Sequence, residues 1–240
     1  MSRFFVSREN IGEGSIALSP DDIQHMRVLR IGSGETFTVC DGEGTDYLCR
    51  FTQQGVAAVL ETFPSEGEPS VECKIYAAFP KGDKTEEITQ KAVQLGVSEV
   101  IMFPSSRCVS KPDTKALDKK LSRWQKISEE AAKQSGRGRI PEVRAFLSFA
   151  AAVEEAVAAQ MPLFLYEDEQ RLRLGAALDK TPDFKTAAVV TGPEGGFDPH
   201  EVEYARTQGM HIVTLGKRIL RCETAPIAAL TAAMFFSGNL

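Results

Sequence analysis

Apolar and polar positions follow one pattern in residues 1–70 and another in the rest of the chain. In the first part, short apolar runs are separated by turn-forming residues, which is typical of a small β-rich module. Ser19 followed by Pro20 is a helix-start signature and predicts one helix between the strands. The predicted strands cover residues 3–6, 35–40 and 46–51.

A polar segment rich in turn formers, residues 64–69, separates this module from a chain with a different rhythm. The predicted strands here cover residues 71–79, 99–103, 162–166, 186–191 and 211–215. The predicted helices cover residues 86–95, 115–133, 149–159, 199–208 and 223–236. Alternating strands and helices favour an α/β domain with a parallel sheet and helices on both faces. We therefore expect two domains, residues 1–70 and 71–240.

The composition is that of an ordinary globular protein, with 42% hydrophobic and 25% charged residues. No apolar run is long enough to cross a bilayer, and the first residues lack the apolar core of a signal peptide. We expect a cytoplasmic protein with no membrane partner. The five cysteines form no CxxC pair and the three histidines have no ligand spacing, so no metal site is expected.

Charge is unevenly distributed along the chain, although the net charge is −5. Residues 1–70 carry 5 Lys and Arg against 11 Asp and Glu, whereas residues 107–144 carry 11 against 5. Such a basic stretch is compatible with a polyanionic partner. It is equally compatible with the solvated face of a helix.

Ligands of open α/β sheets bind beyond the carboxyl ends of the strands, so the loops after Tyr166, Thr191 and Leu215 are candidate sites. Residues 191–197 form a loop with three glycines and a proline, which lets the backbone approach a ligand closely. This loop lacks the spacing of a dinucleotide fingerprint or a phosphate-binding loop. An ordinary glycine-rich turn remains the alternative.

A second unusual segment, residues 215–226, leads from a strand into a long apolar helix. Three cations and a carboxylate crowd its turn, at a helix start whose free N–H groups favour an electron-rich ligand. The alternative is a surface loop whose charges cap the helix.

The two segments together, GPEGGF and LGKRILRCETA, resemble the family of small-subunit ribosomal RNA uridine N3-methyltransferases in the SPOUT superfamily of knotted methyltransferases. The resemblance covers nearly the whole chain. Its other motifs are RFFV at residues 3–6, HMRVLR at 25–30, KGDK at 81–84, QSGR at 134–137 and LYE at 165–167. Cys222 stands where this family would be expected to have threonine.

The resemblance implies a PUA-like β-barrel that helps to hold RNA, followed by a SPOUT-type parallel sheet with a C-terminal deep trefoil knot. It also implies a homodimer and methylation of a uridine N3 in 16S ribosomal RNA from S-adenosyl-L-methionine. The implied donor-binding residues are Leu165, Gly192, Glu194, Gly195, Leu215, Gly216, Ile219, Leu220, Arg221, Thr224 and Ala225. We expect a branched side chain at Gly195 to enter this pocket.

Methylation at uracil N3 requires removal of the N3 proton or stabilisation of the resulting anion, with the base unpaired or flipped out of its stack. Glu194 and Glu223 are the candidate bases. The candidate cations beside the uracil oxygens or RNA phosphates are Arg221, Arg218 and Arg137. A carboxylate close to arginines is as often a structural ion pair.

The expected RNA contacts are cationic or polar side chains that would bind phosphates: His25, Arg27, Arg30, Lys81, Lys84, Arg107, Lys111, Arg137 and Arg139. The acidic charge of the first module opposes RNA except through a local basic face such as Arg27 and Arg30. Two other functions stay open at this point. One is a SPOUT methyltransferase acting on a ribose 2′-hydroxyl or another base, and the other is a non-catalytic RNA-binding assembly factor.

Overall fold

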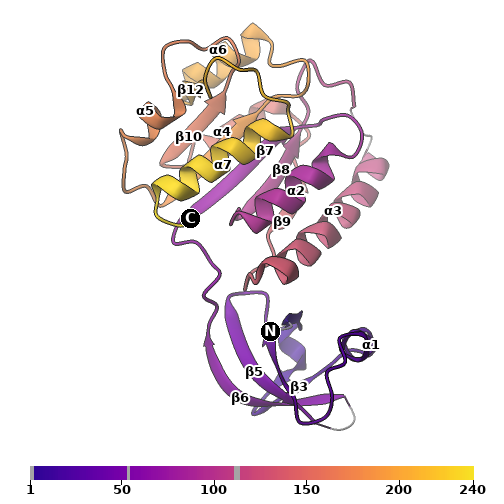
Figure 1. Cartoon of the computed structure of the whole chain (residues 1–240). Helices are drawn as coiled ribbons and strands as arrows, with labels where there is room; N and C mark the ends of the chain where they lie inside the picture. Colours follow the sequence, from indigo (N-terminus) through magenta and orange to yellow (C-terminus); the bar gives the residue numbers. More distant parts are fainter. Residues whose placement is uncertain (1–2, 53–54, 111–113) are drawn as a thin grey trace. The chain divides into compact units, whose positions relative to one another are not determined.

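The computed structural model describes residues 3–52, 55–110 and 114–240, and the chain divides into two compact units (Figure 1). The first unit consists of Met1–Glu68 together with Ala132–Ile140. The second consists of Pro69–Ala131 and Pro141–Leu240. The chain thus leaves the first unit, builds part of the second, and contributes one further segment to the first.

The first unit is built on a six-stranded sheet in the order β1-β4-β5-β6-β3-β2. β1 pairs with β4 in parallel, and the other neighbours are antiparallel. The strands are β1 (Arg3–Phe5), β2 (Ile11–Gly12), β3 (Ser15–Ala17), β4 (Thr36–Cys40), β5 (Thr45–Phe51) and β6 (Val56–Pro64). The predicted strands β1, β4 and β5 are confirmed, whereas β2, β3 and β6 were not predicted.

One α-helix, α1 (Pro20–Val28), and a short 3-10 helix, η1 (Arg8–Asn10), complete this part of the first unit. Ser19 caps α1 by accepting a hydrogen bond from the Asp22 N–H, while Asp22 accepts one from the Ser19 N–H. This capping box and Pro20 confirm the predicted helix start. The core of the unit is formed by buried apolar side chains, among them Phe4, Ile16, Met26, Phe37, Val39, Cys49 and Ala57.

Residues 132–140 are joined to the rest of the first unit by an ion pair and by hydrogen bonds. Arg137 forms an ion pair with Glu68 at 2.7 Å, and its carbonyl accepts a hydrogen bond from Arg3. The Gly138 carbonyl accepts from the Gly44 N–H and from the Cys40 thiol, both at 3.0 Å. The expected division at residue 70 therefore does not describe this unit fully, because it includes a segment from the middle of the chain.

The second unit contains a six-stranded sheet in the order β12-β10-β11-β7-β8-β9, and every pair in it is parallel. The strands are β7 (Glu72–Ala78), β8 (Glu99–Phe103), β9 (Glu142–Ala145), β10 (Met161–Leu165), β11 (Thr186–Thr191) and β12 (His211–Val213). The predicted α/β class with a parallel sheet is confirmed. β9 was not predicted. β10 is shifted by one residue at each end from its predicted range, and the other strands lie within theirs.

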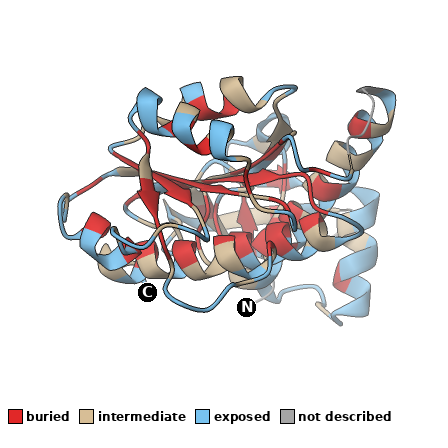
Figure 2. Ribbon diagram, turned by 90° about the horizontal axis from the view of Figure 1, so that it is seen from above, coloured by how far each residue is buried: buried red, intermediate tan, exposed pale blue. Residues whose placement is uncertain are grey.

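Helices cover both faces of this sheet (Figure 2). α7 packs against α2, α5, β7 and β11, whereas α4 packs against α6 and β11. The helices are α2 (Lys84–Gln94), α3 (Thr114–Ser135), α4 (Phe149–Ala156), α5 (Leu174–Leu178), α6 (Pro199–Gln208) and α7 (Thr224–Phe236). α5, with 5 residues, was not predicted.

The longest helix, α3, is amphipathic and carries most of the basic stretch of the sequence. It buries Leu117 and Trp124 and exposes Lys115, Lys119, Arg123 and Lys126. Arg123 forms an ion pair with Glu86 of α2 at 2.8 Å. Within the described parts of the chain, no helix is both long and apolar enough to cross a membrane.

The end of β12 lies between two parts of one connection of the chain. On one side, β12 pairs with β10, and Val213 accepts a hydrogen bond from the Tyr166 N–H. On the other side, the Thr214 N–H donates to the Leu172 carbonyl, and the Thr214 carbonyl accepts a hydrogen bond from the Leu174 N–H at 3.0 Å. The segment that runs from β10 to α5 therefore passes around Thr214.

Candidate active site

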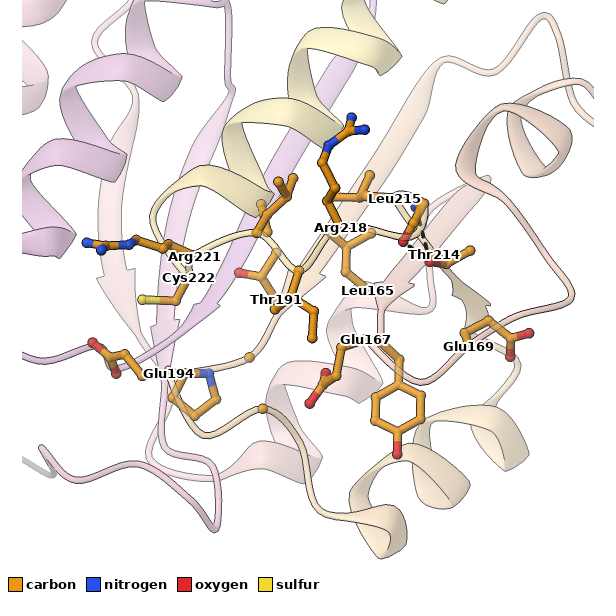
Figure 3. A pocket seen from close by; sticks show the side chains of 18 of the residues that line it. Leu165, Glu167, Glu169, Thr191, Glu194, Thr214, Leu215, Arg218, Arg221 and Cys222 are labelled. Carbon is orange, nitrogen blue, oxygen red and sulfur yellow. Dashed lines mark hydrogen bonds between the residues drawn. The ribbon is translucent and has the colours of Figure 1, made fainter.

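Three loops that follow β10, β11 and β12 surround a pocket of about 950 Å³ (Figure 3). The site expected at the carboxyl ends of these strands is therefore present as a cavity. Its lining includes ten of the expected donor-binding residues: Leu165, Gly192, Glu194, Gly195, Leu215, Gly216, Ile219, Leu220, Arg221 and Ala225. Thr224, at the start of α7, is exposed and does not line the pocket.

Apolar side chains form part of the wall, as expected for a small-molecule pocket. Leu165 is the last residue of the fully buried strand β10 and is only 7% exposed. Leu215 and Leu220 are half-buried, whereas Ile219 is 82% exposed. Ile219 thus lies at the mouth of the pocket, where a ligand would cover it.

Lys84, the first residue of α2, joins the two unusual segments of the sequence. Its ammonium group lies 2.9 Å from Glu194 Oε1, in the loop after β11, and 3.2 Å from Glu223 Oε2, at the start of α7. It also donates a hydrogen bond to Cys222 Sγ at 3.5 Å. The Lys81 N–H donates to Glu194 at 3.0 Å, so two loops are tied to the segment that begins α2.

This ion-pair cluster controls the ionisation of its members. Burial works to raise the pKa of Glu194, but hydrogen bonds from Lys84 and the Lys81 N–H outweigh it and lower the pKa to about 2. Burial acts in the same direction on Glu223, yet its backbone, Cys222 and Lys84 together hold its pKa below the ordinary value. The hydrogen bond to Glu194 raises the pKa of Lys84. All three groups are therefore charged at neutral pH.

Cys222, by contrast, is a buried neutral thiol. Burial raises its pKa to about 12, and the neighbouring carboxylate of Glu223 acts in the same direction. Its thiol donates a hydrogen bond to Glu223 at 3.3 Å. Cys222 therefore fills the space beside Lys84 as a weak hydrogen-bonding group.

The glycines of the loop after β11 lie close to side chains of the same loop and of two other loops. A Cβ at Gly192 would lie 3.2 Å from the Phe197 ring, and one at Gly195 would lie 3.3 Å from the Arg107 Cβ. A branched side chain at Gly195 would therefore meet the loop after β8, which corrects the expectation that it would enter the pocket. Gly196 has φ +66°, and a Cβ there would lie 1.8 Å from Glu167 Oε1.

The loop after β8 supports the loop after β11 from outside. Arg107 donates a hydrogen bond to the Gly195 carbonyl at 3.1 Å and lies 3.6 Å from Asp198. Glu201 of α6 accepts hydrogen bonds from the Ser106 N–H at 2.8 Å and from the Ser105 hydroxyl at 3.1 Å. The Gly-rich loop is therefore fixed on one side by Lys84 and on the other by Arg107.

The three expected catalytic residues are close together but differ in exposure. Glu223 does not line the pocket, and its side chain is 12% exposed. The Arg221 side chain is 83% exposed and lies 3.9 Å from Glu223. Of this group, Arg221 is the residue that can reach a bound substrate without breaking an ion pair to Lys84.

Several further residues line the pocket. Six of them lie in the two segments that the sequence indicated, although they were not assigned to the donor: Thr191, Pro193, Gly196, Lys217, Arg218 and Cys222. Lys84 was assigned to RNA. The residues that lie outside these segments are Tyr166, Glu167, Glu169, Gln170, Arg173 and Thr214, and for Tyr166 and Glu167 the available signal was the LYE motif.

The expected RNA contacts are found in both units. His25, Arg27 and Arg30 are exposed in or just after α1, and Arg139 is exposed in the segment 132–140. Lys81 is exposed in the second unit. Lys111 lies outside the described residues.

Arg137 and Lys84 do not fit the expectation that they bind phosphates. The Arg137 side chain is 5% exposed and holds Glu68 with two hydrogen bonds, so it is a structural cation of the first unit. The ammonium group of Lys84 is shared by two carboxylates. Both expectations are corrected for the same reason, because each cation would have to leave its carboxylate partner in order to bind a phosphate.

Two family models match this chain. The first describes an RNA methyltransferase domain and matches residues 67–234, and the second describes an RNA methyltransferase PUA domain and matches residues 18–54. The first match spans the whole pocket, because all of its lining residues fall inside the matched range.

Named relatives and a solved structure agree with these models. The chain is 34% identical to ribosomal RNA small subunit methyltransferase E from Synechocystis sp., over 95% of this chain and 75% of that protein. It is 31% identical to the protein of the same name from Bacillus subtilis, over 98% and 96% of the two chains. The crystal structure of a ribosomal RNA small subunit methyltransferase E from Neisseria gonorrhoeae bound to S-adenosyl methionine superposes with a TM-score of 0.85, at 31% identity, and covers 98% of this chain and 97% of that chain. This chain therefore belongs to the family of ribosomal RNA small subunit methyltransferases E.

Proposed function

We propose that this protein transfers a methyl group from S-adenosyl-L-methionine to N3 of a uridine in 16S ribosomal RNA. The observation that carries the proposal is the pocket formed by the loops after β10, β11 and β12. It is built from the two segments whose sequences resemble the family. A relative with the same fold over 97% of its length has this donor bound.

The residues of the pocket fit this donor. A volume of about 950 Å³ suits a ligand of nucleoside size with an amino-acid tail. Leu165, Leu215 and Leu220 offer apolar surface to an adenine ring. Gly216 lines the pocket with φ +116° and no atom within 4 Å of its Cβ position, and its N–H and carbonyl are hydrogen-bonded to the Thr214 hydroxyl at 3.1 and 3.3 Å.

The main chemical requirement of this reaction is deprotonation of the acceptor nitrogen. The bound donor supplies an electrophilic methyl group, and its departing sulfur becomes neutral without acid catalysis. Uracil N3 is protonated at neutral pH, so the protein must favour the N3 anion in line with the methyl carbon.

We assign unequal roles to Glu194, Arg221 and Glu223 in this step. Arg221 is exposed at the pocket and stabilises the negative charge on the uracil oxygens. Glu194 and Glu223 are ionised and can accept the N3 proton only after Lys84 moves away from them. The pKa of each carboxyl is held below its ordinary value, so both are weak bases, and of the two Glu194 lines the pocket whereas Glu223 does not.

The RNA would be held by exposed cations in both units. Arg27, Arg30 and Arg139 lie on the first unit, and Lys81 lies near the pocket on the second. Lys115, Lys119 and Lys126 of α3 are further exposed cations of the second unit. We propose that the first unit is a PUA-like barrel that positions RNA, and that the second carries out catalysis. Such a protein would work in the cytoplasm, where ribosomal RNA is assembled into ribosomal subunits.

We further propose a trefoil knot and a homodimer. Thr214 is hydrogen-bonded on both sides by the segment that connects β10 to α5, and the chain then continues into α7. This arrangement supports threading of the C-terminal segment through a loop. Phe235 of α7 is 74% exposed, which supports an α7-mediated contact with a second copy. Small-angle scattering in solution measures the mass of the particle, which for a homodimer is twice that of the chain.

The acceptor is tested by mass spectrometry of ribosomal RNA from a deletion strain. Selective loss of 3-methyluridine, restored by the wild-type gene, is the expected result. Retained 3-methyluridine with another modification missing would instead favour a SPOUT enzyme for a ribose hydroxyl or another base. Calorimetry with S-adenosylmethionine addresses the remaining alternative, because a non-catalytic assembly factor would show no binding with or without RNA.

A further inference from the structure

The carboxylates that line the pocket are not equivalent. Glu194 is paired with Lys84. Glu169 accepts hydrogen bonds from the Arg171 N–H at 2.6 Å and the Leu172 N–H at 3.3 Å, so it shapes the loop after β10. Glu167 is the third of these pocket carboxylates, and within the described chain no group donates a hydrogen bond to it and no cation lies within 4.0 Å.

The exposed Glu167 side chain lies against the loop after β11. Its Oε1 lies so close to Gly196 that a Cβ on that glycine would come within 1.8 Å of it. The carboxylate therefore lies between the loop after β10 and the loop after β11, both of which line the donor pocket. Figure 3 shows it beside Leu165, while the guanidinium groups of Arg218 and Arg221 point away from it.

The donor and its product differ at one atom that such a carboxylate can sense. S-adenosylmethionine carries a positive sulfonium, and S-adenosylhomocysteine carries an uncharged sulfur of almost the same shape. An unpaired carboxylate attracts the first through charge and gains little from the second. The attraction is modest where solvent reaches the group, but no competing cation of the described chain cancels it here.

We propose that Glu167 recognises the positive charge of the methyl donor and so favours S-adenosylmethionine over S-adenosylhomocysteine. The inference rests on the proposed donor and does not depend on which RNA atom accepts the methyl group. In this role Glu167 helps the product leave, because the attraction is lost once the methyl group has been transferred.

Titration calorimetry with both compounds tests this in the wild type, in Glu167→Gln and in Glu167→Asp. Removing the charge should lower the ratio of S-adenosylmethionine affinity to S-adenosylhomocysteine affinity by about three- to fivefold, the scale of one partly solvated ion pair. Glu167→Asp should keep most of the preference because it keeps the charge. The effect of Glu167→Gln should shrink as salt is added.

Asp168→Asn is the matched control, because Asp168 is an exposed carboxylate in the same loop that does not line the pocket. It should leave the ratio unchanged. An equal loss of both affinities in Glu167→Gln, or an unchanged ratio, would overturn the proposal. Absence of binding of either compound to the wild type would instead refute the proposed donor, and an altered acceptor would leave this result untouched.

Discussion

At the scale of single residues, Gly196 is the position where backbone conformation and pocket geometry depend on each other most directly. Its φ of +66° is costly for a residue with a side chain, and its missing Cβ leaves room for the Glu167 carboxylate. Both requirements arise in the same loop that Lys84 and Arg107 hold in place.

We predict that Gly196→Ala destabilises the protein by about 1 kcal/mol, because a left-handed conformation strains an alanine. It should also weaken donor binding, since the carboxylate of Glu167 must move. Chemical denaturation and calorimetry measure the two effects. Gly175→Ala, in α5, is the control: its Cβ would meet nothing within 4 Å, and its φ lies outside the left-handed range, so both quantities should stay near wild type.

A second prediction concerns the ionisation of Glu194. Its folded pKa of about 2 lies below the ordinary carboxyl value of 4.5, so its ion pair stabilises the fold above pH 4.5 and the effect is lost as the pH falls toward 2. Glu194→Gln should therefore cost about 1 kcal/mol of unfolding free energy at pH 6, after allowance for solvent screening. The difference between the two proteins should vanish near pH 2. A difference that is constant across this pH range would disprove the ion-pair account.

At the scale of elements, Lys84 connects the start of α2 to the loop after β11 and to the start of α7. We predict that Lys84→Gln lowers S-adenosylmethionine affinity by about tenfold, because two carboxylates are left without their cation. Lys84→Arg should recover part of the affinity. Lys91→Gln removes another lysine of the same helix, one that pairs with Glu87, and should have no effect on donor binding. A loss of RNA affinity alone in Lys84→Gln would restore the phosphate-binding role.

The sequence was a good guide to elements with strong local signals. α6 was predicted at its observed bounds because Asp198, Pro199 and Glu201 form a complete helix start. β10 and β11 read as buried apolar runs, as parallel strands do. β9 was missed because Glu142 and Arg144 alternate with its apolar positions, so four residues carried no clear signal.

The site was predictable in part, because some of its loops also have strong local signals. Glycines and prolines at the ends of strands identified the pocket loops without any contact information. The pairing of Lys84 with Glu194 joins residues 110 positions apart, and no local pattern encodes it. The same holds for Glu167 and Gly196, and for Arg137, whose partner Glu68 lies 69 positions away.

At the scale of the whole molecule, RNA binding should depend on exposed cations of both units. We predict that Arg27→Gln with Arg30→Gln, and separately Lys119→Gln with Lys126→Gln, weaken RNA binding by about tenfold while leaving donor affinity unchanged. Each lost phosphate contact should reduce the slope of log affinity against log salt by about one. Lys180→Gln, on the surface after α5, is the control. Unchanged RNA affinity in either double variant would remove that unit from the RNA interface.

The central claim is the methylation of uridine N3, and the direct measurement uses purified components. The protein is incubated with methyl-labelled S-adenosylmethionine and small ribosomal subunits from the deletion strain, and the RNA is digested and analysed by mass spectrometry. The account predicts labelled 3-methyluridine at one position in 16S RNA, and its loss in Arg221→Ala. Label in a ribose methyl group or in another base, or no label although the donor binds, would contradict it.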